Sequence, residues 1–309
     1  MLVKLYGVRG SIACAGDETR RYGGNTSCVA IVVGGETLIF DAGTGLRKLG
    51  GDLMKAHGPT GVKAHLFLSH LHWDHIQGFP FFTPAFVPKN QLTVWGVAPR
   101  PSTGDSVPDG DPITLELAPA DYTDPNPRDG VRAALASQMK APNFPVGLDA
   151  MRADLGFFDV PYGERIELNP FVTVRHVGVD HPNGCVAWRV DSGGKSVVYA
   201  TDLELAEGKD GAVFDGLADL AKGADLLIFD AMYTPEEYEG GNGRMSRKGW
   251  GHSTFDMGAA VAEAAGVKQL ALFHHDPAHD DDFMDALCAR AQKRLSSTMV
   301  CSEGLEMNL

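Results

Sequence analysis

The chain has 309 residues, of which 44% are hydrophobic and 22% charged, proportions that are ordinary for a folded protein with a substantial core. Lys and Arg number 27 against 40 Asp and Glu, so the formal net charge is −13. This balance argues against a protein whose affinity comes from a broad footprint on a nucleic-acid backbone, although it leaves a small anionic substrate open.

The pattern of cysteines and the length of the apolar runs indicate in which cellular compartment the protein is expected. The five cysteines are scattered and never form a C-x-x-C pair, so we expect free thiols rather than a disulfide framework or a zinc knuckle. The first residues have the pattern of a strand rather than of a signal peptide, and no apolar run approaches membrane-spanning length. By default, we expect a cytoplasmic protein.

Strands and helices are expected in both halves of the chain. Apolar runs and alternation predict strands at 2–6, 28–33, 37–40, 64–69, 92–97, 172–177, 186–190, 197–200, 226–229 and 270–273, with helices at 46–57, 255–265 and 281–295 and a short strand pair at the end. This mixture predicts an α/β protein in which two sheets pack face to face with helices outside.

Residues 98–160 differ in composition from the rest of the chain. They are rich in Pro, Asp and Gly at first and then show short helical patterns at 131–139 and 148–155. They also carry phenylalanines to bury, at 144, 157 and 158. We therefore expect a single domain over 1–309 with an inserted, lid-like segment at about 98–160 rather than a linker.

The run His70-Leu71-His72-Trp73-Asp74-His75 holds four potential metal ligands directly after an apolar strand. His70 and His72 alternate along an extended chain and can face one metal, whereas Asp74 and His75 follow where a loop turns into helix and can reach a second. Imidazole suits zinc, and a carboxylate also allows manganese or iron. A merely polar, histidine-rich loop is the alternative, and the spacing favours the metal site.

Further candidate ligands occur at strand ends, where side chains from separate strands can converge. His181 precedes the strand that begins at Cys185, Asp202 follows the strand at 197–200, and His274 follows the strand at 270–273. Each one alone is more often a structural or surface residue. Together with the first run, they predict a dinuclear site.

Eight short runs of the chain carry a resemblance to a known family: Gly7-Val8-Arg9-Gly10-Ser11, Arg21-Tyr22-Gly23-Gly24-Asn25-Thr26-Ser27, Phe40-Asp41-Ala42-Gly43-Thr44-Gly45, the run at 70–75, His181-Pro182, Thr201-Asp202, Gly251-His252-Ser253-Thr254 and Leu272-Phe273-His274. Over nearly its whole length the chain resembles metallo-β-lactamase-fold hydrolases. Within them it resembles the phosphodiesterase branch, which includes tRNA 3′-end endonucleases and cyclic-nucleotide and cyclic-phosphate phosphodiesterases. The resemblance implies a four-layer αββα sandwich.

The resemblance also implies a role for each matched residue. Two divalent metal ions, zinc with manganese as the alternative, would be held by His70, His72 and His181, by Asp74, His75 and His274, and by Asp202 as the bridge. Asp41 resembles the carboxylate that accepts the second N–H of a ligand histidine, and Asp230 ends a strand near the site. His65, His275 and His279 are expected not to be ligands.

For catalysis, the resemblance implies that a metal-bridging hydroxide attacks phosphorus. His252 would be the general acid for the leaving alkoxide, and Asp74 would have a catalytic role besides binding metal. A residue that merely flanks a helix beside Ser253-Thr254 is the alternative for His252. Asn25 would donate a hydrogen bond near the site, although a plain glycine turn explains its run almost as well.

These features favour phosphodiester hydrolysis in a small or cyclic nucleotide or phosphate substrate. The resembling tRNA endonucleases carry a flexible arm between the third histidine and the bridging aspartate, and here a tight strand-turn-strand joins His181 to Asp202. Alternatives are tRNA 3′-end endonuclease, thioesterase or lactamase activity, and, more distantly, a non-catalytic metal-binding sensor. No extended nucleic-acid or membrane contact is expected, and the resemblance suggests a homodimer.

Overall fold

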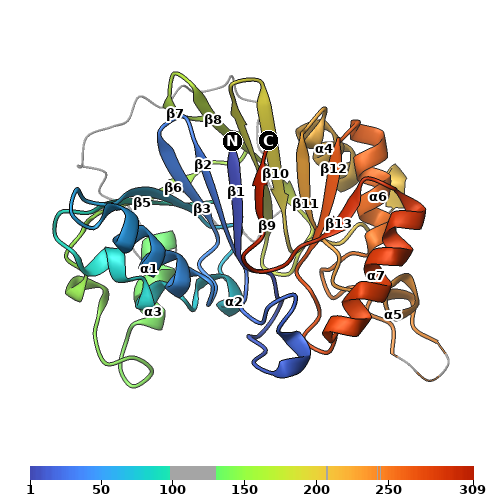
Figure 1. Ribbon diagram of the computed structural model, residues 1–309, viewed down its shortest axis with the longest axis horizontal. Helices are drawn as coiled ribbons and strands as arrows, with labels where there is room; N and C mark the ends of the chain where they lie inside the picture. Colours follow the sequence, from blue (N-terminus) through green and yellow to red (C-terminus); the bar gives the residue numbers. More distant parts are fainter. Residues whose placement is uncertain (98–129, 207, 242, 244) are drawn as a thin grey trace.

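Two seven-stranded sheets face each other across a shared apolar interior, and helices cover both outer faces (Figure 1). The computed structural model describes all residues except 98–129, 207, 242 and 244. Three large clusters of buried side chains separate the layers, one between the sheets and one under each layer of helices. The predicted four-layer αββα sandwich is therefore confirmed.

The two sheets have related topologies. The first sheet contains, in spatial order, β14 (Glu306–Asn308), β1 (Leu2–Gly7), β2 (Cys28–Val33), β3 (Glu36–Phe40), β4 (Lys63–Phe67), β5 (Gln91–Val97) and β6 (Asp154–Val160). The second contains β13 (Thr298–Val300), β12 (Gln269–Phe273), β11 (Leu226–Asp230), β10 (Lys195–Ala200), β9 (Cys185–Ser192), β8 (Val172–Val179) and β7 (Ile166–Asn169). In each sheet one part is antiparallel and the other, β3 to β6 or β10 to β13, is parallel.

The helices connect these strands and lie outside the sheets. They are α1 (Leu46–His57), α2 (Trp73–Ile76), α3 (Val131–Gln138), α4 (Ala212–Ala221), α5 (Pro235–Glu239), α6 (Phe255–Ala265) and α7 (Asp281–Arg294). Short 3-10 turns occupy η1 (Asp17–Thr19), η2 (Phe79–Phe81), η3 (Thr83–Phe86), η4 (Leu148–Ala150) and η5 (Gly208–Asp210). Within the described residues, no helix has the length and apolarity needed to cross a membrane.

The apolar pattern of each strand decides which layer its side chains enter. Leu38 and Phe40 of β3 point to the space between the sheets, whereas Ile39 packs under α1, as a period of two residues requires. Phe40 and Phe67 stack there with ring centroids 5.3 Å apart, and Trp188 of the other sheet meets Phe67 edge-on at 5.2 Å. These large rings hold the two sheets together.

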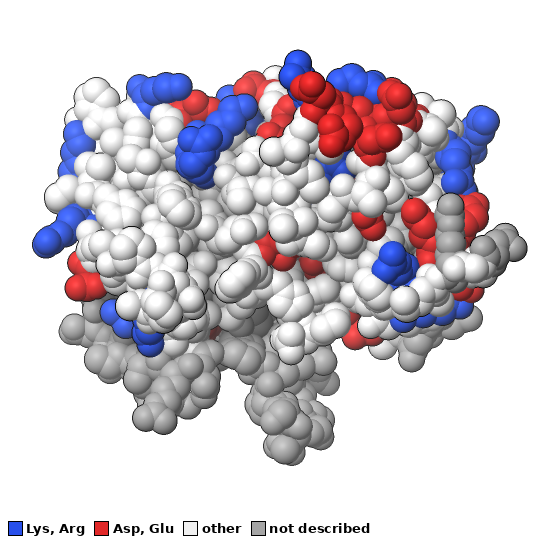
Figure 2. Space-filling view, turned by 90° about the horizontal axis from the view of Figure 1, so that it is seen from below, with Lys and Arg blue, Asp and Glu red and all other residues white. Residues whose placement is uncertain are grey.

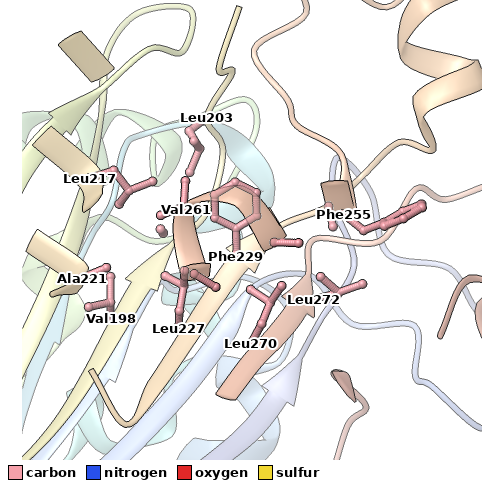
Figure 3. Close-up of a cluster of buried hydrophobic side chains, with 14 of the residues drawn as sticks. Val198, Leu203, Leu217, Ala221, Leu227, Phe229, Phe255, Val261, Leu270 and Leu272 are labelled. Carbon is pink, nitrogen blue, oxygen red and sulfur yellow. The ribbon is translucent and has the colours of Figure 1, made fainter. Parts of the chain in front are cut away.

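Helix α6 packs closely on the outer face of the second sheet (Figure 3). Val261 of this helix lies over Leu227 and Phe229, beside Leu270 and Leu272 of the next strand. A Cβ atom at Gly258 of α6 would lie 2.6 Å from the Phe229 ring, so the glycine permits the close approach of helix and sheet.

Several elements differ from those predicted. Helices α4 and α5 and strand β7 were not predicted, and the two C-terminal strands belong to different sheets, with β13 beside β12 and β14 beside β1. Within the expected insertion, 98–129 lies outside the described residues, and the helical piece expected at 148–155 ends at Ala150. Residues Asp154–Val160 instead form β6, because Phe158 packs toward the other sheet and Phe157 toward the helices.

Candidate metal centre

The carboxyl ends of the parallel strands lie at one edge of the two sheets, and the polar residues that follow them converge there. Ser69 and His70 follow β4, Asp202 follows β10, and His274 follows β12. Helix α2 adds Asp74 and His75 at the lower edge of the sheets (Figure 1). This placement follows the general rule that sites in such sheets form at the carboxyl ends of strands.

The first group of candidate ligands is His70, His72 and His181, whose nitrogen atoms lie close enough to hold one ion. His181 Nε2 lies 3.1 Å from His72 Nδ1, and the His70 ring lies 4.5 Å from the His72 ring. His70 Nε2 is buried without a hydrogen-bond partner among the described residues. Nitrogen atoms that face one another in this way fit a shared cation better than mutual hydrogen bonds.

The second group is Asp74, His75, Asp202 and His274. His75 Nε2 and His274 Nε2 are 3.3 Å apart, and Asp74 Oδ2 lies 3.2 Å from His75 Nε2. Gly10 makes this packing possible, because a Cβ atom there would lie 2.4 Å from the His274 ring. The donor set of imidazole and carboxylate suits zinc, manganese or iron.

Asp202 joins the two groups with its two carboxylate oxygens. Oδ1 lies 3.1 Å from His75 Nε2 and 3.2 Å from His274 Nε2, whereas Oδ2 lies 3.7 Å from both His70 Nε2 and His181 Nε2. The structure therefore brings together all seven residues that the sequence indicated as ligands. The His/Asp cluster fits two divalent ions with Asp202 between them.

The buried charges of this cluster shift one another's pKa values. Burial would lower the pKa of His75, but the carboxylates of Asp202 and Asp74 raise it well above its ordinary value. Burial would raise the pKa of Asp202, but His274 and His75 lower it well below its ordinary value. Burial lowers the pKa of His70 well below its ordinary value, which favours the neutral ring that can bind a cation.

Asp41 orients the His75 ring by a contact with its Nδ1 atom. Its Oδ2 lies 2.7 Å from His75 Nδ1 and accepts hydrogen bonds from Ser69 Oγ and Tyr199 Oη, both at 2.8 Å. Its Oδ1 accepts from the Ser69 amide at 2.7 Å. The expected contact of Asp41 with a ligand histidine is present, and such contacts fix ring orientation and raise ligand basicity.

Left-handed backbone is concentrated at this site. Five non-glycine residues among those described have φ between 50° and 68°, namely Ser11, Asp41, Asn183, Asp202 and His274. Two of them, Asp202 and His274, are ligand candidates. The other three contact ligand candidates: the Ser11 backbone amide donates to Asp74, the Asp41 carboxylate contacts His75, and the Asn183 side-chain Nδ2 lies 3.1 Å from His72 Nε2. This conformation costs about 1–2 kcal/mol for an L-residue, so the surrounding contacts must hold each turn that aims these groups.

His252 lies beside both groups of ligands. Its ring stacks on His274 with centroids 5.0 Å apart, and its Nδ1 lies 2.8 Å from Asp230 Oδ2. Burial would lower the pKa of His252, but the Asp230 carboxylate raises it to about 9. The Asp230 carboxylate thus favours the imidazolium form of this ring, the form that can donate a proton.

Asn25 corrects an expectation. Its Nδ2 donates to Glu303 Oε2 at 2.9 Å and its backbone amide donates to the other oxygen of Glu303. Because the C-terminal segment occupies both donors, the 23–26 turn is a structural connection rather than a source of hydrogen bonds to the site. The glycine-turn alternative describes it better.

Three histidines that were expected not to be ligands have other partners. His65 Nδ1 accepts from Trp95 Nε1, His275 Nε2 donates to the Cys301 carbonyl, and His279 Nε2 lies 3.0 Å from Glu237. The register after β12 thus turns His274 toward the cluster and His275 away from it.

Sequence reasoning missed several groups that support the site. Ser69 and Tyr199 bind Asp41, the Ser11 amide donates to Asp74, and the Gly251 carbonyl accepts from His181 Nδ1 at 2.8 Å. A hydroxyl in front of His70 was an available signal for Ser69. The backbone groups of Ser11 and Gly251 leave no mark in the sequence beyond their place in matched runs.

A cavity of about 310 Å³ lies beside the first group of ligands. His70, His72, Asn183, Leu71 and Tyr162 are among its lining residues. No Lys, Arg, Asp or Glu lines it among the described residues. Its size and neutral lining suit a small organic group next to the cluster.

Comparison with known proteins gives the family context. Residues 36–275 match the model of a family described as "Beta-lactamase superfamily domain", which is more than half of the chain. A ribonuclease Z from Brevibacillus brevis is 34% identical over 114 residues, which cover 36% of this chain and only 31% of that protein. A ribonuclease Z from Methanosarcina mazei is 25% identical over 309 residues, covering 92% of each.

Solved structures show the same fold. The metallo-β-lactamase fold protein YhfI from Bacillus subtilis has a TM-score of 0.64 at 18% identity, covering 99% of this chain and 98% of its own. A diphosphatase from the PhnP family has a TM-score of 0.60 at 15% identity, covering 100% of this chain and 97% of its own. At these identities the likeness concerns the fold.

Proposed function

The chain belongs to the beta-lactamase superfamily, and we propose that this metal-dependent phosphodiesterase acts on a small or cyclic phosphodiester. The observation that carries the proposal is the His252–Asp230 pair, 2.8 Å apart, with its histidine ring stacked on His274 at the edge of a cluster of seven candidate ligands. Phosphodiester cleavage expels an alkoxide, a poor leaving group, and a proton donor beside the metals meets that need.

The residues of the cluster would have different roles in this reaction. Bound divalent ions, for which we propose zinc with manganese as the alternative, would neutralise phosphoryl oxygens and acidify a water molecule. Asp202 and Asp74 would hold the ions, and His252 would pass its proton to the leaving oxygen. Asp230 keeps His252 Nδ1 engaged at 2.8 Å, which leaves Nε2 as the donor atom.

The link between His181 and Asp202 supports a small substrate. Strands β9 and β10 fill it and are joined by a Gly193-Gly194 turn, so the arm of the resembling tRNA endonucleases has no counterpart there. The distribution of Lys and Arg on the surface also supports a small substrate. Figure 2 shows Lys and Arg mainly around the edge of the face seen from below, and not gathered over its middle.

A tRNA 3′-end endonuclease is the second candidate. The observation in its favour is the name of the relatives, because the ribonuclease Z from Methanosarcina mazei aligns over 92% of this chain. The two candidates share the metal chemistry and differ in the substrate that the surrounding surface admits.

Metal analysis and a substrate panel test the proposal. The zinc-loaded protein is expected to bind about two metal ions per chain and to hydrolyse bis-p-nitrophenyl phosphate. In the panel, cyclic nucleotides and cyclic ribose phosphates are expected to be cleaved faster than precursor tRNA, nitrocefin or a glutathione thioester. Less than one metal ion per chain together with no diesterase activity in zinc or manganese would contradict the proposal, and preferred cleavage of precursor tRNA would favour the second candidate.

Matched histidine variants make the test specific. His181→Ala is expected to lose one metal site and most of the activity, because this ring belongs to the first group of ligands. His57→Ala removes an exposed histidine of α1 and is expected to keep both metal content and turnover.

A further inference from the structure

Glu204 is a buried carboxylate that none of the steps above uses. It follows Asp202 by two residues, is 4% exposed, and reaches the loop 249–252 that precedes α6. Its Oε1 accepts hydrogen bonds from Tyr238 Oη at 2.7 Å and the Gly249 amide at 2.8 Å, and its Oε2 accepts from the Gly251 amide at 2.8 Å. No Lys or Arg pairs with it among the described residues, so these three donors compensate its burial.

The loop that Glu204 binds has little stiffness of its own. Gly249 and Gly251 have φ of 80° and 82°, and glycine leaves the chain more freedom than any other residue. Gly251 also lies close against a candidate ligand, since a Cβ atom there would lie 2.4 Å from His181 Nδ1. Its carbonyl accepts a hydrogen bond from that same nitrogen at 2.8 Å, which fixes the ring of a ligand histidine.

The segment after Asp202 holds this loop at two points. The Leu203 carbonyl accepts from Ser253 Oγ at 2.7 Å, and the Leu203 amide donates to Asp230 Oδ2 at 3.1 Å, the atom that also faces His252. Glu204 supplies the second point, on the other side of His252. The backbone that carries the candidate bridging ligand therefore also sets the position of the candidate general acid.

We propose that Glu204 is a positioning residue, which holds the 249–252 loop so that the Gly251 carbonyl orients His181 and the His252 ring faces the leaving group. The effect on His252 rests on the proposed phosphodiesterase function, whereas the effect on His181 concerns metal binding alone. The two effects can therefore be measured separately.

Glu204→Gln is the test variant. Glutamine keeps the size and one acceptor oxygen, but its amide nitrogen is a donor and must face at least one of the N–H or O–H donors that Glu204 now satisfies. Glu306→Gln, the same change at an exposed glutamate of β14, is the matched control. Urea unfolding of all proteins checks that the variants are folded under assay conditions.

Zinc affinity, measured by competition with a chromophoric chelator, is the first readout. In Glu204→Gln the weaker of the two zinc sites is expected to bind about 10-fold less tightly, because an outer contact that orients a ligand histidine typically contributes about 10–100-fold. Glu306→Gln is expected to match the parent protein. An unchanged zinc affinity in Glu204→Gln would overturn the proposal whatever the activity.

Leaving-group dependence at saturating zinc is the second readout. For a cyclic nucleotide, which expels an alkoxide, kcat is expected to fall about 10–100-fold in Glu204→Gln, whereas for bis-p-nitrophenyl phosphate it is expected to stay within about 3-fold, since p-nitrophenolate needs no proton. An equal fall for both substrates would overturn the positioning of His252. If the parent protein cleaves neither diester, the proposed function fails while the zinc measurement still decides on Glu204.

Discussion

Replacement of Asp230 by Asn tests whether this carboxylate keeps His252 protonated. Asp230 is fully buried, with Oδ2 at 2.8 Å from His252 Nδ1 and Oδ1 accepting from the Met232 amide. Asparagine has nearly the same shape and can keep one acceptor, but it carries no charge. The substitution therefore removes the ion pair at nearly unchanged size, and urea unfolding checks that the protein tolerates an amide nitrogen where Oδ2 now accepts from the Leu203 amide.

The size of the effect follows from the pKa of His252. Burial would lower this pKa, and Asp230 raises it from an ordinary 6.5 to about 9. Without the carboxylate we expect a pKa of about 6.5 or below. At pH 8 the protonated fraction of the ring then falls from about nine-tenths to about 3%, roughly 30-fold. Bound metal ions lower the pKa in both proteins, so the comparison between them reports Asp230.

The sign of the pH effect is set by the acid role. A general acid must be protonated, so turnover is present below the pKa of His252 and is lost as pH rises through it. In Asp230→Asn the basic limb of the profile of kcat against pH is expected to move down by about 2.5 pH units. The assay uses a cyclic nucleotide at saturating zinc, and Asp219→Asn, at an exposed aspartate of α4, is the control. A basic limb that stays in place with two metal ions bound would refute the reasoning.

Three further changes probe the same site. His252→Ala is expected to lower kcat for alkoxide leaving groups about 10²–10⁴-fold with metal content unchanged in metal analysis, and a lost metal ion would make His252 a ligand instead. Asp41→Asn is expected to weaken zinc binding about 10–100-fold in chelator competition, because His75 loses its charged partner; zinc binding equal to that of the parent would contradict the role of Asp41. Leu272→Ala, which truncates a fully buried side chain of β12 two residues before His274, is expected to lower the free energy of unfolding in urea by about 2–5 kcal/mol, and a loss below 1 kcal/mol would show that the core relaxes.

The clustering of the candidate ligands could be anticipated from the sequence because each candidate outside the first run lies near the end or the start of a strand. Apolar runs end directly before Asp202 and His274, and the carboxyl ends of neighbouring parallel strands meet at one edge of a sheet. The choice between His274 and His275 also follows from register, since successive side chains point in opposite directions. Element prediction was weaker where strands are short and lie at a sheet edge, as β7 does. For α4 a signal existed, because Phe214, Leu217 and Ala221 recur at helical spacing and are buried.

The outer contacts of the site could not be predicted, because they join residues far apart in sequence or use only backbone atoms. Glu303 takes the donors of Asn25 from 278 positions away, and no local pattern in either segment indicates the pair. Left-handed backbone at Asp202 and His274 is equally invisible, since neither residue type requires it. Yet these turns decide where the candidate ligand atoms lie. The sequence predicts which residues form the metal centre. Tertiary contacts such as those of Asp41 and Glu204 set the orientation of these residues, on which the chemistry of the centre depends.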